Sequence, residues 1–528
     1  MRPRRAAGGS PRSVRIVAYA VNGAGVGHLT RLIGIMRWVR RYAQVLGVRA
    51  EIWFLTSSEA EGLLFHERFA AFKLPSKTVV EDAGLDKLAY LALAKQWVWH
   101  SLGLLRPDLL VVDTFPRGAF GELLGALDLV AHRAFVYRPV KAEVAERADF
   151  QAMLPLYDRV VIPEPEGTPV SLPDGVEPVF TGPIAVRDPV ELLSRAEARR
   201  RLGLPADGPA VLVSAGGGGD ALVSAQLDVA LEAVRGLPVV VAAGPLYRGV
   251  PRREGVIWLT QGGLMELLPA FDVAVAAAGY NTFHELMLAG VPAVFLPQPK
   301  IADDQEGRAR RAVAAGAAQI CPLDAAAIRA SVEALLADPG ASDAARRLVP
   351  RSGARHAAQE LLRLVLPEAD VDRAAEALDD AVLGVPGLPF VIDLAHTLDP
   401  EDPIASKGCI DAALTLLSAA DALYVPRPLL LRLARELSKR LSGTPAERAD
   451  AFQRFLRAAA PFHDWGAAQT FARLLLVDRG APWLEGYARA LDAAAAQGQG
   501  LHDVVRRLSA LLAAPEPPAT NAALMAAL

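Results

Sequence analysis

Residues 271–285 read FDVAVAAAGYNTFHE, and this segment carries the clearest structural signal in the 528-residue chain. Its first half, from Val273 to Ala276, is a short apolar run typical of a buried parallel strand. Gly279 then opens a turn into a helical segment. Asn281 and Thr282 fall in the first helical turn, where free backbone N–H groups attract phosphate. We therefore predict a strand, a glycine turn and a helix whose N-terminus binds an anion; a capped helix without a ligand is the simpler alternative.

Similar apolar runs recur on both sides of this segment and alternate with helical segments. Alternation of this kind predicts parallel sheets with right-handed crossovers. Between residues 163 and 189 the composition shifts to Pro, Gly and Glu, which indicates a linker between two α/β lobes. The predicted strands are 14–21, 51–55, 109–113, 134–137 and 159–162 before the linker, and 210–214, 238–243, 256–259, 273–276 and 293–296 after it.

Beyond residue 370 the alternation fades, and Leu-, Ala- and Arg-rich amphipathic segments take over. The N-terminal residues carry several arginines but no apolar stretch behind them, so we do not expect a secretory signal there. We predict four regions. They are a disordered tail over 1–13, a first α/β lobe over 14–185, a second α/β lobe over 186–365 and a helical accessory domain over 370–515.

Composition and charge exclude several classes of protein. Hydrophobic residues make up 52% of the chain, which is long enough to bury a large core and is therefore not disordered throughout. Its 56 basic and 59 acidic side chains give a net charge of −3, which argues against nucleic acid as a partner. Two cysteines, Cys321 and Cys409, cannot build a disulfide scaffold or a Cys-rich zinc site. No apolar run is long enough to span a membrane, and we expect a cytoplasmic protein.

A glycine loop, Gly23-Ala24-Gly25-Val26-Gly27-His28, follows the first predicted strand. His28 replaces the third glycine of a dinucleotide-binding motif, which weakens that interpretation. Asp113 ends another apolar strand, and the carboxyl ends of parallel strands meet at one edge of a sheet. A carboxylate bonded to one imidazole nitrogen raises the basicity of the other, so we predict a general-base dyad of His28 and Asp113. A structural histidine and a helix-capping aspartate are the alternatives.

The second lobe offers further polar groups. A second glycine loop, Ser214 to Gly219, can bring backbone N–H groups close to a ligand. Glu285 lies one helical turn beyond the predicted anion site and can accept hydrogen bonds from two vicinal ribose hydroxyls. Asp304 and Gln305 follow the next strand and offer hydrogen bonds to the hydroxyls of a sugar.

This ordered set resembles the donor signature of the GT-B nucleotide-sugar glycosyltransferases. The set is Gly279-x-Asn281-Thr282-x-x-Glu285, then Gly290-Val291-Pro292, Pro297 and Asp304-Gln305, and the resemblance extends over residues 14–365. The most similar patterns are those of the peptidoglycan N-acetylglucosaminyltransferases and the UDP-glycosyltransferases. The resemblance implies an α/β GT-B fold, in which two Rossmann-like lobes face each other across a cleft, here with an α-helical C-terminal appendage.

The resemblance also implies roles for individual residues. The first lobe is the acceptor side, where His28 is the catalytic base and Asp113 is its partner. The second lobe binds the nucleotide sugar, and there the ring of Trp258 stacks on the base and Gln261 contacts the nucleoside. Ala277 departs from the small-molecule transferases, which have a phosphate-binding histidine at this position. The implied donor-binding residues are Gly25, Gly27, Ser214, Gly216, Gly217, Trp258, Gln261, Gly279, Asn281, Thr282, Glu285, Asp304 and Gln305.

The implied reaction transfers a sugar from a nucleotide diphosphate sugar, with a UDP-sugar as the expected donor, to an acceptor hydroxyl. We expect inversion at the anomeric carbon without a metal or cofactor, because helix N-termini and glycine amides stabilise the leaving diphosphate. A lipid-linked acceptor and a small molecule are both left open. Peripheral contact with the inner membrane face and a protein partner for the helical domain are further expectations. The alternatives are a UDP-N-acetylglucosamine 2-epimerase-like enzyme and a non-catalytic nucleotide-sugar-binding module.

Overall fold

The computed structural model describes residues 13–382, except for 22–25, 47, 68, 219–222, 250–254, 260–263 and 301–302. Contacts divide the chain into two compact units, and Val14–Val39 with Glu51–Leu366 form the unit that holds both sheets. The other unit comprises Met1–Ser13, Arg40–Ala50 and Pro367–Leu528, and contains α15 (Glu368–Val382). The tail predicted to be disordered, apart from Ser13, and the predicted helical domain beyond Val382 lie outside the described residues.

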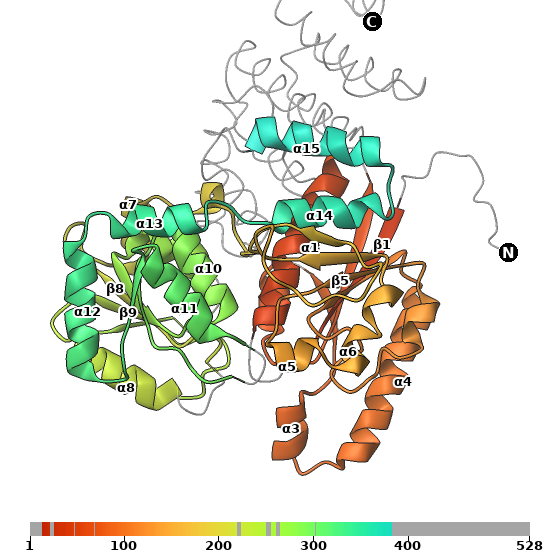
Figure 1. The fold of residues 1–528 in the computed structure, drawn as a ribbon, viewed down its shortest axis with the longest axis horizontal. Helices are drawn as coiled ribbons and strands as arrows, with labels where there is room; N and C mark the ends of the chain where they lie inside the picture. The colour runs from red at the N-terminus through yellow and green to blue at the C-terminus, as the bar shows by residue number, and fades with distance from the viewer. Residues whose placement is uncertain are drawn as a thin grey trace, which may run out of the picture. The chain divides into compact units, whose positions relative to one another are not determined.

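The first lobe is built on a seven-stranded sheet (Figure 1). Its strand order is β3-β2-β1-β4-β5-β6-β7, so the order reverses between β1 and β4. The ladders between β1 and β4 and onward to β7 are parallel, as is the ladder between β2 and β3. The strands are β1 (Ser13–Ala20), β2 (Arg49–Thr56), β3 (Ala70–Lys73), β4 (Leu109–Asp113), β5 (His132–Val136), β6 (Arg159–Ile162) and β7 (Pro178–Phe180).

The second lobe repeats this plan with six strands. Their order is β10-β9-β8-β11-β12-β13, every ladder is parallel, and the order reverses between β8 and β11. The strands are β8 (Val211–Ser214), β9 (Val239–Ala242), β10 (Ile257–Leu259), β11 (Val273–Ala276), β12 (Ala293–Phe295) and β13 (Ala318–Ile320).

Helices cover both faces of the second sheet (Figure 1). One hydrophobic core joins the sheet to α8 and α12, and a separate core joins it to α10, α11 and α13. In the first lobe, α4 packs on the sheet through Val98 and Leu102. The longer helices are α1 (Gly27–Val45), α4 (Lys87–Leu105), α7 (Arg195–Leu202), α8 (Val223–Ala233), α10 (Tyr280–Ala289), α11 (Gln305–Ala314), α12 (Ala325–Ala337), α13 (Ala341–Leu348) and α14 (Ala354–Arg363).

Short helices complete the described part of the chain. They are α2 (Gly62–His66), α3 (Lys77–Asp82), α5 (Ala142–Ala145), α6 (Ala148–Gln151) and α9 (Leu264–Leu267). A search of the described helices finds none that is long and apolar enough to cross a membrane.

Every strand predicted from an apolar run is present, and the structure adds three more. β3 and β13 are short and lie at the edges of their sheets, where burial is too small to give a strong apolar signal. β7 lies within residues 163–189, which we predicted to be a linker only, so that prediction was wrong for this segment. Pro178 is the first residue of β7, and an edge strand tolerates the missing N–H of a proline there.

The sheet topology places the candidate site. In open α/β sheets, ligands bind at the carboxyl ends of the strands, where the strand order reverses. In the first lobe these ends belong to β1 and β4. β1 precedes the first glycine loop, and β4 ends at Asp113. In the second lobe they belong to β8 and β11, which precede the second glycine loop and α10.

The aromatic core of the first lobe gives a test of its stability. Phe135 on β5 is fully buried, and its ring lies 5.3 Å from the ring of Tyr157 and 5.7 Å from that of Tyr137. We expect Phe135→Ala to lower the free energy of unfolding of this lobe by about 3–5 kcal/mol, because it leaves a cavity. Denaturant unfolding followed by circular dichroism measures the loss. Phe65→Ala, at a side chain that is 61% exposed, is the matched control and should leave the midpoint unchanged.

Candidate active site

The predicted dyad assembles at the strand-order reversal of the first lobe. His28 is the second residue of α1, and Asp113 is the last residue of β4, which pairs with β1. The His28 Nδ1 and Asp113 Oδ2 atoms are 2.6 Å apart, and both side chains are buried. The structure therefore brings together two predicted residues that lie 85 positions apart in the sequence.

This hydrogen bond fixes the tautomer of His28, and burial keeps its ring neutral. Burial lowers the pKa of His28, and the bond to Asp113 opposes this effect only in part. Burial alone would raise the pKa of Asp113, yet Arg31 and His28 hold it far below its ordinary value. An ionised carboxylate can only accept, so Nδ1 of the neutral imidazole carries the proton and Nε2 is an acceptor. An imidazole in this state can take a proton from a hydroxyl group.

The turn that follows Asp113 is held in a strained conformation. Thr114 has a φ of 63°, in the left-handed region that β-branched residues rarely adopt. Its backbone N–H donates to the Val136 carbonyl at 2.9 Å, and its hydroxyl donates to Asp113 Oδ2 at 2.9 Å. Strain of this kind costs about 1–3 kcal/mol and concentrates at functional sites, where it holds a group in position.

His28 lines a cavity of about 470 Å³ to which both lobes contribute. The predicted site residues that line it are Gly27, His28, Ser214, Gly216, Gly217, Gly279, Asn281, Thr282, Glu285 and Gln305. The structure thus confirms two Rossmann-like lobes that face each other across a cleft, which is the GT-B arrangement.

The glycine loop after β8 forms one wall of this cavity. Gly216 and Gly218 have φ values of 62° and 80°, which side chains rarely allow. A Cβ atom on Gly218 would also clash with the Ala243 carbonyl. The Gly216 N–H donates to Ser214 Oγ at 3.2 Å. The sequence therefore needs glycine here for a tight turn that keeps backbone groups at the cavity wall.

The N-terminus of α10 forms the opposite wall of the second lobe. Gly279 precedes the helix, and Asn281 and Thr282 lie in its first turn, as predicted. The Asn281 amide nitrogen donates to the hydroxyl of Thr30 on α1, so this helix end contacts the first lobe. Asn281 Oδ1 is buried and has no hydrogen-bond partner within the described residues, which leaves an acceptor at the cavity.

Tyr280, the first residue of α10, connects this helix to the end of β6 in the first lobe and to the segment that follows β7. Its hydroxyl donates to the Pro163 carbonyl and accepts a hydrogen bond from the Ile184 N–H at 3.2 Å. Its ring lies between two arginines, with the Arg31 guanidinium 4.9 Å and the Arg308 guanidinium 5.6 Å from the ring centroid. One arginine belongs to each lobe, so the ring is held from both sides of the cleft.

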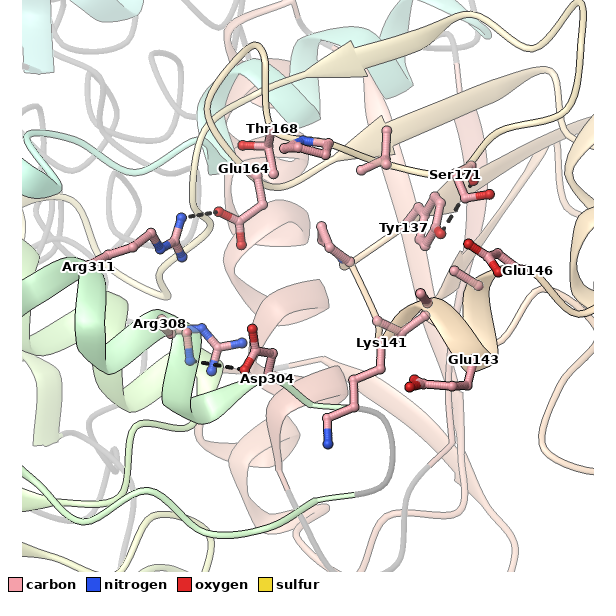
Figure 2. Close-up of a pocket in the computed structure, with 17 residues that line it drawn as sticks. Tyr137, Lys141, Glu143, Glu146, Glu164, Thr168, Ser171, Asp304, Arg308 and Arg311 are labelled. Carbon is pink, nitrogen blue, oxygen red and sulfur yellow. Dashed lines mark hydrogen bonds and ion pairs between the residues drawn. The ribbon is translucent and has the colours of Figure 1, made fainter.

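Four predicted donor-binding residues are not brought to this cavity by the described structure. Trp258 lies on β10, where its ring stacks on Tyr247 at 5.9 Å. Asp304 is exposed and caps α11 by accepting from the Gly307 N–H at 2.9 Å. It lines a different cavity, of about 780 Å³, beside Lys141 and Arg308 (Figure 2). Gly25 and Gln261 lie outside the described residues.

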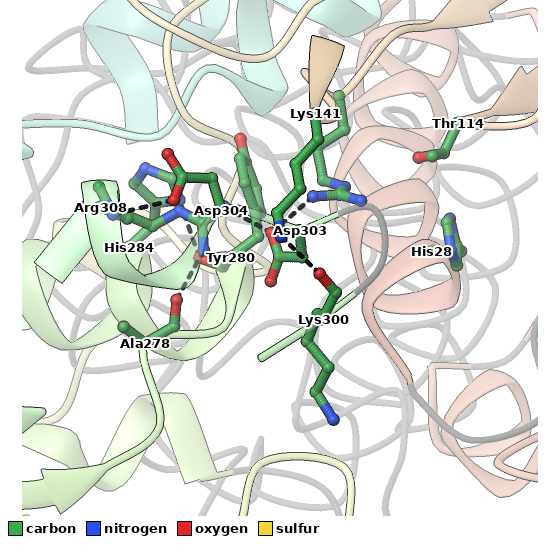
Figure 3. Close-up of polar contacts among 12 residues, drawn as sticks. His28, Thr114, Lys141, Ala278, Tyr280, His284, Lys300, Asp303, Asp304 and Arg308 are labelled. Carbon is green, nitrogen blue, oxygen red and sulfur yellow. Dashed lines mark hydrogen bonds and ion pairs between the residues drawn. The ribbon is translucent and has the colours of Figure 1, made fainter. Parts of the chain in front are cut away.

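Sequence reasoning missed a group of charged residues around the cleft (Figure 3). Asp303 accepts hydrogen bonds at 2.7 Å from Arg138 of the first lobe and from Arg308 of the second. Lys141 Nζ donates to the Lys300 carbonyl at 2.7 Å, which adds a further hydrogen bond between the lobes. One signal was available for Arg138, because it comes two residues after the carboxyl end of β5.

Arg31 is the other residue that was missed. Its Nε donates to Asp113 Oδ1 and its Nη2 to Asp113 Oδ2, both at 2.8 Å. The side chain is almost completely buried. Arg31 follows His28 by three positions, and residues with this spacing share one face of a helix. The helix that begins at Gly27 could therefore have revealed it.

The cavity lining suits an anionic diphosphate. The α10 N-terminus offers backbone N–H groups, the glycine loop lets the backbone approach a ligand closely, and the side chains of Arg138 and Lys300 add positive charge. Among the residues that the structure describes, no three His, Cys, Asp or Glu side chains lie close enough together to hold a metal ion.

Known proteins that are similar to this chain act on nucleotide sugars or are named as glycosyltransferases. The UDP-N-acetylglucosamine–N-acetylmuramyl-(pentapeptide) pyrophosphoryl-undecaprenol N-acetylglucosamine transferase of Rhodococcus jostii is 35% identical over 191 residues, which are 34% of this chain and 50% of that protein. An uncharacterised glycosyltransferase of Methanopyrus kandleri is 30% identical over 160 residues, which are 28% of this chain and 43% of that protein. Over about a third of its length, the chain is similar to named glycosyltransferases. This finding confirms the resemblance inferred from the sequence.

The relationship covers only part of each protein. The chain spans about half the length of the curated glycosyltransferases that it matches first. No family model matches it. Among solved glycosyltransferase structures, spinosyn rhamnosyltransferase SpnG shares 17% identity with a TM-score of 0.44, over 69% of this chain and 100% of that one. The MurG structure from Acinetobacter baumannii shares 19% identity with a TM-score of 0.41, over 67% and 99%.

Glu285 gives a pH-dependent test of the cavity. Burial, with a smaller effect from the charge of Glu266, raises the pKa of Glu285 from 4.5 to about 8. The folded protein therefore keeps this proton over a pH range in which the unfolded chain has lost it. We expect the stability of the parent relative to Glu285→Gln to fall as the pH rises from 4.5 to about 8. The slope is at most about 1.4 kcal/mol per pH unit.

Denaturant unfolding of the parent and Glu285→Gln at several pH values measures this difference. Glu306→Gln, at an exposed position on α11, controls for the loss of a carboxylate and should show no such trend. A stability difference for Glu285→Gln that stays constant with pH would show that Glu285 is ionised in the folded protein.

Proposed function

We propose that the protein is a nucleotide-sugar glycosyltransferase that moves a hexose to an acceptor hydroxyl. The observation that supports this proposal is that His28, the α10 N-terminus and the glycine loop after β8 line one cavity. His28 is neutral there, and its ring is oriented by the Asp113 carboxylate. The first side of this cavity can accept a proton, and the second can bind a diphosphate. Both functions are needed at the two ends of a glycosyl transfer.

In the proposed reaction, His28 Nε2 takes the proton of the acceptor hydroxyl as its oxygen bonds to C1 of the sugar. The bond from C1 to the diphosphate oxygen breaks, and the diphosphate leaves with the electron pair. The N–H groups at the start of α10 and the cations Arg138 and Lys300 stabilise the charge that develops on the leaving oxygens. A single displacement of this kind inverts the anomeric centre and needs no bound metal.

A UDP-sugar is the proposed donor. The relative from Rhodococcus jostii is named for its use of UDP-N-acetylglucosamine, and Glu285 lies in the cavity where it can bind ribose hydroxyls. In this structure Trp258 stacks on Tyr247 and Asp304 caps α11. To bind the donor as proposed, both side chains must make different contacts. The proposed division of the chain assigns residues 14–185 to the acceptor and 186–365 to the donor.

Two alternatives make different demands on the cavity. A UDP-N-acetylglucosamine 2-epimerase-like enzyme acts on the nucleotide sugar alone and would turn over without an acceptor. A non-catalytic nucleotide-sugar-binding module would not depend on the His28–Asp113 pair at all. The strained turn at Thr114, which holds Asp113 against His28, favours a catalytic role over simple binding.

His28→Ala separates these functions. The variant should lose at least about a hundredfold in the rate of transfer, because it lacks the general base. It should still bind the donor, since the α10 N-terminus and the glycine loop are unchanged. Release of UDP from UDP-N-acetylglucosamine and other UDP- and dTDP-sugars measures turnover, and calorimetry measures donor binding.

The control is His132→Ala. His132 is the first residue of β5, so it lies at the edge of the sheet opposite to the carboxyl ends of the strands, where the dyad lies. Unchanged turnover in His28→Ala would remove the dyad from the mechanism, and turnover of the sugar without any acceptor would favour the epimerase. The anomeric configuration of the product, read by NMR, tests inversion. Activity that disappears with EDTA and returns with a divalent metal would contradict a metal-independent reaction.

We also propose that the acceptor is lipid-linked and that α4 contacts the inner membrane face. One face of α4 packs on the lobe through Tyr90, Ala94, Val98 and Leu102, and its other face is apolar but exposed. Leu88, Leu93 and Leu104 are 76%, 61% and 83% exposed, and Lys87 and Lys95 lie among them on the helix. Exposed leucines with lysines suit an anionic lipid surface. The named acceptor of the relatives is a lipid-linked saccharide.

Replacing Leu88, Leu93 and Leu104 together by serine should reduce binding to vesicles of phosphatidylglycerol and phosphatidylcholine by at least about tenfold, because each buried leucine contributes about 1.5–3 kcal/mol. Co-sedimentation of the full chain with vesicles measures this loss. Leu156→Ser, at a leucine that is 46% exposed in the same lobe, is the control. Equal binding by the triple variant and the parent would contradict membrane contact through α4.

A further inference from the structure

We infer that Arg31 is a positioning residue for the His28 base, acting through the Asp113 carboxylate. This inference deepens the proposed function and rests on it, because it assigns Arg31 a role in the same proton transfer. It concerns a residue outside the predicted dyad. This role rests on geometry, because Arg31 bonds to both carboxylate oxygens of Asp113.

The guanidinium of Arg31 forms a two-pronged contact with Asp113. Nε lies 2.8 Å from Oδ1 and Nη2 lies 2.8 Å from Oδ2. Parallel bonds of this kind fix the plane of the carboxylate as well as its position. Oδ2 is also the atom that accepts from His28 Nδ1 at 2.6 Å. The plane set by Arg31 therefore decides where the imidazole can make its hydrogen bond.

Arg31 is itself held in place by contacts from both lobes. It lies one turn after His28 on α1, its Nη2 donates to the Thr114 hydroxyl at 3.2 Å, and its side chain is 1% exposed. The ring of Tyr280 from the second lobe lies 4.9 Å from its guanidinium. Its Nη1 is buried without a hydrogen-bond partner within the described residues, and Arg31 is among the residues that line the cavity. A side chain held so tightly can transmit position to the carboxylate.

Arg31 also balances the charge of Asp113. The charged groups that act on His28 are Asp113, Arg31 and Arg138. The carboxylate favours the protonated imidazole, and the two arginines oppose it and lower the pKa of His28. Without Arg31, only Arg138 would oppose the effect of the carboxylate on His28. The pKa of His28 would rise, and more of the base would be protonated and inactive near neutral pH.

Arg31→Met and Arg31→Lys test the two parts of this role. Methionine removes both the charge and the two-pronged contact, whereas lysine keeps the charge alone. We expect Arg31→Met to lower transfer at neutral pH by at least about tenfold, with recovery as the pH rises. Arg31→Lys should be impaired less, with little change in the pH profile. The KM for the donor should stay near that of the parent in both variants, because the guanidinium of Arg31 bonds to Asp113 and Thr114 and not to the α10 N-terminus or the glycine loop.

A second measurement does not depend on activity. In the full chain labelled with ¹⁵N-histidine, the His28 resonances, assigned with His28→Ala, report the tautomer and the pKa directly. The parent should show the Nδ1–H tautomer, and Arg31→Met should show a higher pKa and a weaker preference for that tautomer. If no sugar is transferred by the parent, the proposed function fails while this NMR test of Arg31 still gives its own result.

Arg199→Met is the matched control for the loss of a buried arginine. Arg199 is also buried and donates to an aspartate, Asp272, at 2.8 Å, but it lies in the second lobe on α7. It should lower stability without changing the His28 titration; Arg195→Met, at the exposed arginine that pairs with the same aspartate, replaces it if it fails to fold. An unchanged His28 pKa and tautomer in Arg31→Met would overturn the inference.

Discussion

The buried charge of Asp113 is the constraint on which the first lobe depends. A carboxylate that is removed from water costs several kcal/mol unless charged and hydrogen-bonding groups surround it. Here Arg31, His28 and Thr114 supply these groups. Arg31 and His28 must lie on one face of α1 to reach the same carboxylate, and Thr114 must adopt a left-handed backbone. The helix register and the turn geometry thus follow from one buried charge.

The two lobes use the same topology for opposite electrostatic tasks. In each lobe, the strand order reverses beside the first strand, and a glycine loop follows that strand. The first lobe places a negative carboxylate at its reversal and so stabilises positive charge on an imidazole. The second lobe places a helix N-terminus at its reversal and so stabilises negative charge on a ligand. A transfer that creates both charges at once can use the cavity between them.

The sequence predicted the parts of this arrangement that depend on local patterns. Apolar runs located the central strands, and the glycines after β1, β8 and β11 located the three loops or turns that reach the cavity. His28 and Asp113 were paired because both follow strands of one sheet. Contacts between the lobes had no local pattern to reveal them. Asp303 is paired with Arg138, 165 positions away, and an arginine in the loop after a strand gives no sign of which distant carboxylate it meets.

Short edge strands escaped prediction for a related reason. β7 has only three residues, each of them half-buried, so it lacks the apolar run that marked the central strands. Trp258 shows the reverse case. Its ring was expected to stack on the base of the nucleotide, and in the structure it stacks on Tyr247. A large ring can contribute to a core or to a site, and local sequence does not distinguish the two.

The hydroxyl of Tyr280 has a mechanical consequence. Its hydrogen bonds to the Pro163 carbonyl, directly after β6, and to the Ile184 N–H, in the segment that leaves β7 for the second sheet, attach the first residue of α10 to the first lobe and to the connection between the two sheets. Any rotation of one lobe against the other that preserves these bonds must turn about an axis that passes near Tyr280. Atoms close to such a pivot travel least. The α10 N-terminus would then remain almost stationary during such a rotation, while the outer rims of the lobes move the farthest.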